Sequence, residues 1–73
     1  MAGRIGTSSI TNALRAKEIL EAAHIPAEII RLRPDESPGG CAYGVEFQGS
    51  ELARAAALLS RENVKFNMLQ GSP

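Results

Sequence analysis

The stretch Cys41-Ala42-Tyr43-Gly44-Val45-Glu46-Phe47 carries the clearest strand pattern in the chain. Successive side chains of a strand point to opposite faces, so its large apolar residues and its small or charged residues separate onto two faces. The first face holds Cys41, Tyr43, Val45 and Phe47. Loop-forming residues at 34–40 and the pair Gly49-Ser50 predict where this strand begins and ends.

Periodicity predicts five further elements on either side of that strand. Apolar residues spaced by three and four predict helices at 10–23 and 51–62, each preceded by good N-cap residues. Alternation predicts strands at 27–33 and 64–68, together with a short strand at 4–7. The order βαββαβ is that of the split βαβ, or ferredoxin-like, arrangement. We therefore predict an α+β fold in which a four-stranded antiparallel sheet carries both helices on one face.

Length and composition limit what such a fold can be. The 73 residues leave room for one domain, 1–73, with an ordered core at about 4–70. Eight basic and eight acidic residues cancel, so no net charge attracts nucleic acid or an anionic membrane. No targeting segment is recognisable, and no apolar run reaches the ~20 residues that span a bilayer. The single cysteine excludes an internal disulfide and fits the reducing cytoplasm, where we expect a soluble protein.

The motifs of metal, phosphate and nucleic-acid sites are missing from the sequence. It has no Cys-x-x-Cys, no His/Cys pair at metal-ligand spacing and no Gly-x-x-x-x-Gly-Lys, so we expect neither a metal nor a cofactor. His24, the only histidine, is predicted in solvent at the far end of the first helix, away from Cys41. Residues 40–47 match only the tail of the RNA-binding strand signature, which argues against RNA binding.

Cys41 is the one candidate reactive group. In the sheet order 4-1-3-2, the third strand begins at the edge where the first strand ends and the first helix begins. Cys41 is therefore predicted close to Thr7, Ser8 and Ser9. A helix N-terminus carries partial positive charge, which favours a thiolate over a thiol and makes a cysteine nucleophilic.

Neighbouring residues are expected to support this thiol. Arg33, at the end of the second strand, would add positive charge, while Gly39, Gly40 and Gly44 would leave backbone room for a bulky partner. A place beside a Gly/Pro-rich loop favours exposure of the sulfur. The alternative is that Cys41 is a small buried apolar residue on the core face of its strand.

Three segments resemble a known family. They are Thr7-Ser8-Ser9-Ile10-Thr11-Asn12-Ala13-Leu14-Arg15-Ala16, Ala22-Ala23-His24-Ile25-Pro26-Ala27-Glu28 and Gly39-Gly40-Cys41-Ala42-Tyr43-Gly44-Val45-Glu46-Phe47. In this order they look like the small selenium/sulfur carrier protein-like family, over about residues 5–68. The resemblance implies that Cys41 holds a persulfide or perselenide, received from a donor such as a cysteine desulfurase and passed to an acceptor enzyme. His24 stands where the family usually has glycine, and Pro38-Gly39-Gly40 stands where many relatives have serines.

Two functions of different classes remain open. The first is sulfur or selenium relay by Cys41. The second is a noncatalytic interaction or regulatory module that dimerises or docks on a larger enzyme, with Cys41 structural. Its docking face would be the outer sheet face, with Ile29, Ala42, Gly44 and Leu69. A stand-alone enzyme has the least support, because no constellation beyond one thiol exists, and a homodimer is compatible with both functions.

Overall fold

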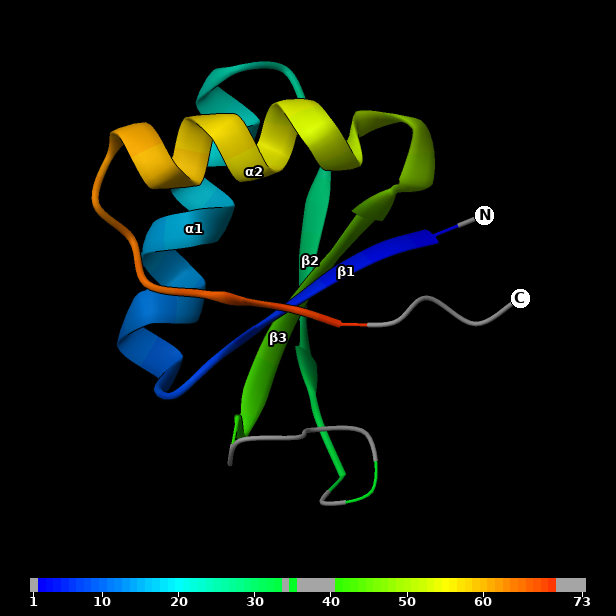
Figure 1. Ribbon diagram of the computed structural model, residues 1–73, viewed down its shortest axis with the longest axis vertical. Coiled ribbons are helices and arrows are strands. Elements are labelled where there is room, and N and C mark those ends of the chain that lie inside the picture. The colour runs from blue at the N-terminus through cyan, green and yellow to red at the C-terminus, as the bar shows by residue number, and fades with distance from the viewer. Residues whose placement is uncertain (1, 34, 36–40, 70–73) are drawn as a thin grey trace.

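Four strands and two α-helices follow the predicted βαββαβ order in the computed structural model, which describes residues 2–33, 35 and 41–69. In chain order the elements are β1 (Ala2–Thr7), α1 (Ile10–Ala22), β2 (Ala27–Arg31), β3 (Tyr43–Gln48), the short 3-10 helix η2 (Gly49–Glu51), α2 (Leu52–Arg61) and β4 (Asn67–Met68). The sheet order is β2-β3-β1-β4, and neighbouring strands are antiparallel (Figure 1). The α+β, ferredoxin-like prediction is therefore confirmed.

Tertiary pairing changes the lengths of the strands from those that the sequence predicts. The sequence predicts β1 as short and poor, yet it spans six residues and lies inside the sheet. β3 pairs with all of β1, from Ala2 opposite Gln48 to Thr7 opposite Tyr43. β4, predicted over 64–68, is reduced to two residues at the sheet edge. Cross-strand pairing outweighs intrinsic strand preference in both cases.

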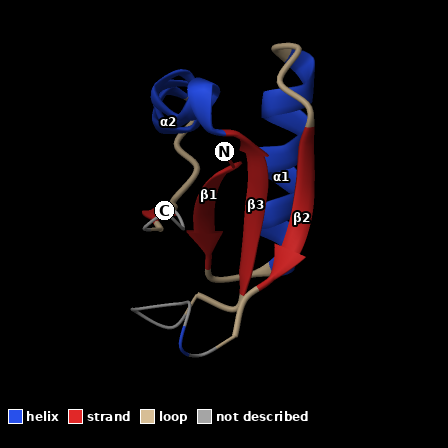
Figure 2. Ribbon diagram, turned by 90° about the vertical axis from the view of Figure 1, so that its right-hand side faces the viewer, coloured by secondary structure: helices blue, strands red, loops and turns tan. Residues whose placement is uncertain are grey.

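One hydrophobic core lies between the sheet and the helices. The strands contribute Ile5, Val45 and Phe47, all of them buried. The helices contribute Ala13, Ala16 and Leu20 of α1 and Ala55 and Leu59 of α2. Because these residues form a single cluster, both helices pack on the same face of the sheet, as predicted (Figure 2). None of the helices in the described part of the chain combines the length and apolar character that crossing a bilayer requires.

The opposite face of the sheet, here called the open face, includes Gly44 of β3. A Cβ added at Gly44 would lie 3.3 Å from side-chain atoms of both Ile30 and Leu32, so these two residues lie on the open face. Ile29 pairs with Val45 and packs against the core. The expectation that Ile29 lines the outer face is therefore wrong. Alternation separates the two faces of β2, but only its register with β3 decides which of them meets the helices.

Both helices end in the same local structure. His24 and Asn63 adopt left-handed backbone conformations, with φ of 64° and 60°. The next residue in each case returns its N–H to the helix, from Ile25 to the Leu20 carbonyl at 2.9 Å and from Val64 to the Leu59 carbonyl at 3.0 Å. This is the Schellman pattern, in which a left-handed residue allows the chain to satisfy the last helical carbonyls. It explains how His24, which is exposed as predicted, fills a helix-cap position.

The two helices also cap each other. Arg15 of α1 donates to the Glu62 carbonyl at 3.1 Å, at the end of α2, and Arg54 of α2 donates to the Ala23 carbonyl at 2.9 Å, at the end of α1. The two arginines are 39 positions apart in the chain, and so are the two carbonyls. The two halves of the chain thus make equivalent contacts with each other, which indicates an approximate two-fold symmetry, although their sequences show only a weak similarity.

We expect His24→Gly to raise the free energy of unfolding by about 1 kcal/mol, because glycine adopts positive φ without the steric cost that a Cβ imposes. Asn63→Gly is the matched control at the equivalent cap. Asparagine already tolerates this conformation, so the gain there should be only a few tenths of a kcal/mol. Urea unfolding of the three proteins measures both values. Equal gains, or a loss at position 24, would contradict the role assigned to His24.

Candidate functional site around Cys41

The Cys41 sulfur lies on the open face of the sheet, against Gly6. Ile5 points into the core, so Gly6 beside it faces the other way. A Cβ added at Gly6 would lie 3.0 Å from Cys41 Sγ and 3.1 Å from Cys41 Cβ. The alternative in which Cys41 lies on the core face of its strand is therefore wrong. The reason is that β3 begins at Tyr43, so the alternation of the strand does not extend back to residue 41.

The thiol is covered by residues from the end of the chain. Cys41 is only 3% exposed, which overturns the expectation of an accessible sulfur. The Asn67 side-chain amide donates to Cys41 Sγ, with Nδ2 and Sγ 2.9 Å apart. Leu69 Cδ2 would lie 3.2 Å from the same added Cβ of Gly6 that meets the sulfur, so Leu69 packs at this place too. Among the described residues, Gly6, Asn67 and Leu69 lie around the thiol.

Two of the three predicted hydroxyl neighbours of Cys41, Thr7 and Ser9, instead make hydrogen bonds at the start of α1. Thr7 is buried on the core face of β1, where its Oγ1 donates to the Ser9 carbonyl at 3.0 Å. Ser9 is the N-cap of α1, and its Oγ accepts from the Asn12 backbone N–H at 3.1 Å. Ser8 is exposed. The structure therefore brings the end of β1 and the sulfur to the same edge, but it places Thr7 and the thiol on opposite faces of the sheet.

The other predicted supporting residues are divided between several places. Arg33 is exposed and forms an ion pair with Asp35, with Nε and Oδ1 3.6 Å apart. Gly39 and Gly40 lie outside the described residues. A Cβ at Gly44 would lie 2.7 Å from the Ile5 carbonyl oxygen, so this glycine is required by close packing of β3 on β1. The backbone room beside the sulfur comes from Gly6.

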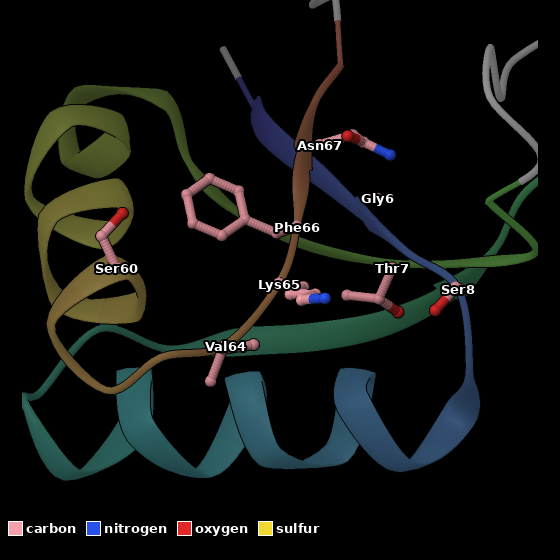
Figure 3. Close-up of a pocket in the computed structure, with 8 residues that line it drawn as sticks. All are labelled: Gly6, Thr7, Ser8, Ser60, Val64, Lys65, Phe66 and Asn67. Carbon is pink, nitrogen blue, oxygen red and sulfur yellow. The ribbon is translucent and has the colours of Figure 1, made fainter.

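An open pocket of about 560 Å³ adjoins this site. The pairing of β1 with β4 includes Gly6 opposite Asn67, and the pocket lies next to this pair. Its lining residues are Gly6, Thr7, Ser8, Ser60, Val64, Lys65, Phe66 and Asn67 (Figure 3). The Phe66 ring points toward α2. Asn67 is thus shared, because it lines the pocket and also contacts the sulfur.

The sequence does not reveal three neighbours of the sulfur, which are Gly6, Asn67 and Leu69. Alternation does place Leu69 on the outer face, but no local pattern indicates that Asn67 or Gly6 contacts Cys41. These contacts depend on the pairing of β1 with both β3 and β4, which joins three distant parts of the chain. Among residues 2–33, 35 and 41–69, no group of three or more His, Cys, Asp and Glu side chains is placed to hold a metal ion.

The fold and this site define a small ferredoxin-like domain whose one cysteine is held under the last strand. The chain belongs to the family described as "Putative Se/S carrier protein-like", whose model matches residues 4–69. The match covers most of the chain and includes Gly6, Cys41, Asn67 and Leu69. Neither the curated proteins nor the solved structures contain a match to this chain.

We expect Gly6→Ala to lower the free energy of unfolding by about 1–3 kcal/mol, because the new methyl group would meet both heavy atoms of the Cys41 side chain. In a Cys41→Ala background the penalty should be smaller, since the 3.0 Å contact with Sγ is removed. Urea unfolding of both single variants and the double variant measures this coupling.

Gly44→Ala provides the control for this cycle. Its nearest contact is a backbone oxygen of Ile5, so its cost should be the same whether residue 41 is cysteine or alanine. An equal cost of Gly6→Ala in the two backgrounds would show that Gly6 does not support the thiol.

Proposed function

We propose that this protein carries sulfur or selenium on Cys41, as a persulfide or perselenide, between a cysteine desulfurase-type donor and an acceptor enzyme. Membership of the carrier-like family supports this function. The observation that carries it is the hydrogen bond from the Asn67 amide to Cys41 Sγ, because it places a polar group of the last strand on the only thiol of the chain. We place this function in the cytoplasm, where a lone thiol of this type stays reduced.

The transfer is an exchange between sulfur atoms. The Cys41 thiolate attacks the outer sulfur of the donor's cysteine persulfide. The bond between that outer sulfur and the donor cysteine breaks, and the donor leaves as a thiolate. The proton of the persulfide travels with the outer sulfur, which is now bonded to Cys41. One S–S bond replaces another, so no oxidant or reductant is consumed. With selenium, the transferred atom changes and the balance stays the same.

A covered sulfur suits a carrier once it is loaded. The outer sulfur of a persulfide reacts with other thiols, which would remove it before delivery. Cys41 is the only cysteine in the chain, so no internal thiol can discharge it as a disulfide. Its 3% exposure limits attack by thiols in solution. The same cover must open for the donor and the acceptor to reach Cys41.

The burial of Cys41 also favours a second function, that of a noncatalytic interaction module. Unpaired cysteines are among the most often buried residues, and many of them only fill space. In this case the thiol would pack β4 against β1, and docking would use the open face with Ile30 and Leu32. The two functions differ in one respect that can be measured, which is whether Cys41 ever takes up sulfur.

We expect the native protein to gain the mass of one sulfur atom when it is mixed with a cysteine desulfurase and L-cysteine. Dithiothreitol should remove that mass. Cys41→Ser, which changes one atom of the side chain, should gain nothing while keeping a similar urea midpoint. Intact-mass spectrometry without reductant measures the uptake. If the desulfurase is shown to be loaded and the native protein gains no mass from L-cysteine or from L-selenocysteine, the carrier function is wrong and the interaction module is favoured.

A further inference from the structure

The strand that covers Cys41 is the most weakly held part of the sheet. In the described residues β4 pairs with β1 only through Met68 and Asn67, and the next hydrogen bond, from the Leu69 N–H to the Arg4 carbonyl, is long at 3.4 Å. β1, by contrast, pairs with β3 along its whole length. Short edge strands with few hydrogen bonds open at a small fraction of the free energy of global unfolding.

Side chains on the two sides of β4 have different surroundings. Asn67 and Leu69 lie on the open face with Gly6 and the sulfur. Met68 is opposite Ile5, so it points to the other face, and it is 54% exposed. Separation of β4 from β1 would therefore withdraw Asn67 and Leu69 from the sulfur and from Gly6.

We infer that Asn67 and Leu69 form a latch over Cys41, and that local opening of β4 controls access to the thiol. Asn67 acts as a positioning residue, because its amide holds Sγ against Gly6 in the closed state. Leu69 supplies the apolar part of the cover. The inference deepens the proposed function, since it names the element that admits the donor to Cys41.

The opening can be confined to the end of the chain. Val64, just before β4, is 6% exposed, and its N–H donates to the Leu59 carbonyl at the end of α2. Phe66 packs against the hydrophobic core. These contacts hold the chain up to residue 66, so a break between β1 and β4 leaves the core, both helices and the other three strands in place.

Alkylation of the native protein by iodoacetamide, measured across low urea concentrations, tests the latch. If β4 opens locally, the labelling rate should change little with urea until global unfolding takes over, because local opening exposes little surface. The latch is overturned if the urea dependence of labelling has the full slope of global unfolding at every concentration. This measurement uses the unmodified chain and does not depend on whether any variant folds.

Substitutions on the two sides of β4 sharpen the test. Leu69→Ala, which removes the apolar cover and leaves the polar contact of the thiol in place, should speed native labelling about tenfold. Met68→Ala, on the side away from the sulfur, should change the rate by less than about twofold. Urea unfolding of each variant separates these effects from changes in global stability. Equal effects on the two sides of β4 would overturn the latch.

Failure of the latch and failure of the carrier function give different results. Local opening without sulfur uptake from the loaded desulfurase would keep the latch and reject the carrier. Sulfur uptake with labelling that requires global unfolding would keep the carrier and reject β4 as its gate.

Discussion

The antiparallel pairing of β1 with β3 is the contact on which the rest of the structure depends. It sets Gly6 opposite Gly44 and Ile5 opposite Val45. The two glycines allow close approach on the open face, where a Cβ at either position would meet neighbouring atoms. The two apolar side chains point to the other face and form the centre of the core that both helices cover. The same pairing brings the chain before β3 alongside the end of β1, so that Cys41 lies on Gly6.

The helices are tied together by contacts that do not involve the edge of the sheet. Arg15 and Arg54 each cap the end of the other helix, and Schellman turns at His24 and Asn63 return the chain to the core. These interactions are local or reciprocal, so the helical layer does not depend on β4. The stability of the molecule is therefore uneven, with the weakest pairing beside its only thiol.

The proposed carrier function has two needs that oppose each other. A sulfur atom must be reachable to accept its cargo, and it must be sheltered to keep it. A permanently exposed cysteine meets only the first need, and one buried in the core between sheet and helices meets only the second. In the proposed latch, a thiol on the open face under a two-residue strand meets both needs, since a small local opening would separate the two states. The interaction-module alternative needs only the closed state.

Local periodicity and composition predict the order of elements, the α+β class and Cys41 as the only candidate thiol. The sheet order follows only because this order of elements matches the split βαβ arrangement. Alternation along the strand correctly places Val45 and Phe47 on the core face, but it also assigns Cys41 to that face, whereas Cys41 lies on the open face. The burial of that cysteine, the core position of Ile29 and the contacts of Gly6 and Asn67 were decided only by the tertiary structure. Asn67 lies 26 positions from the sulfur that it contacts, and only the pairing of strands distant in the chain brings such residues together.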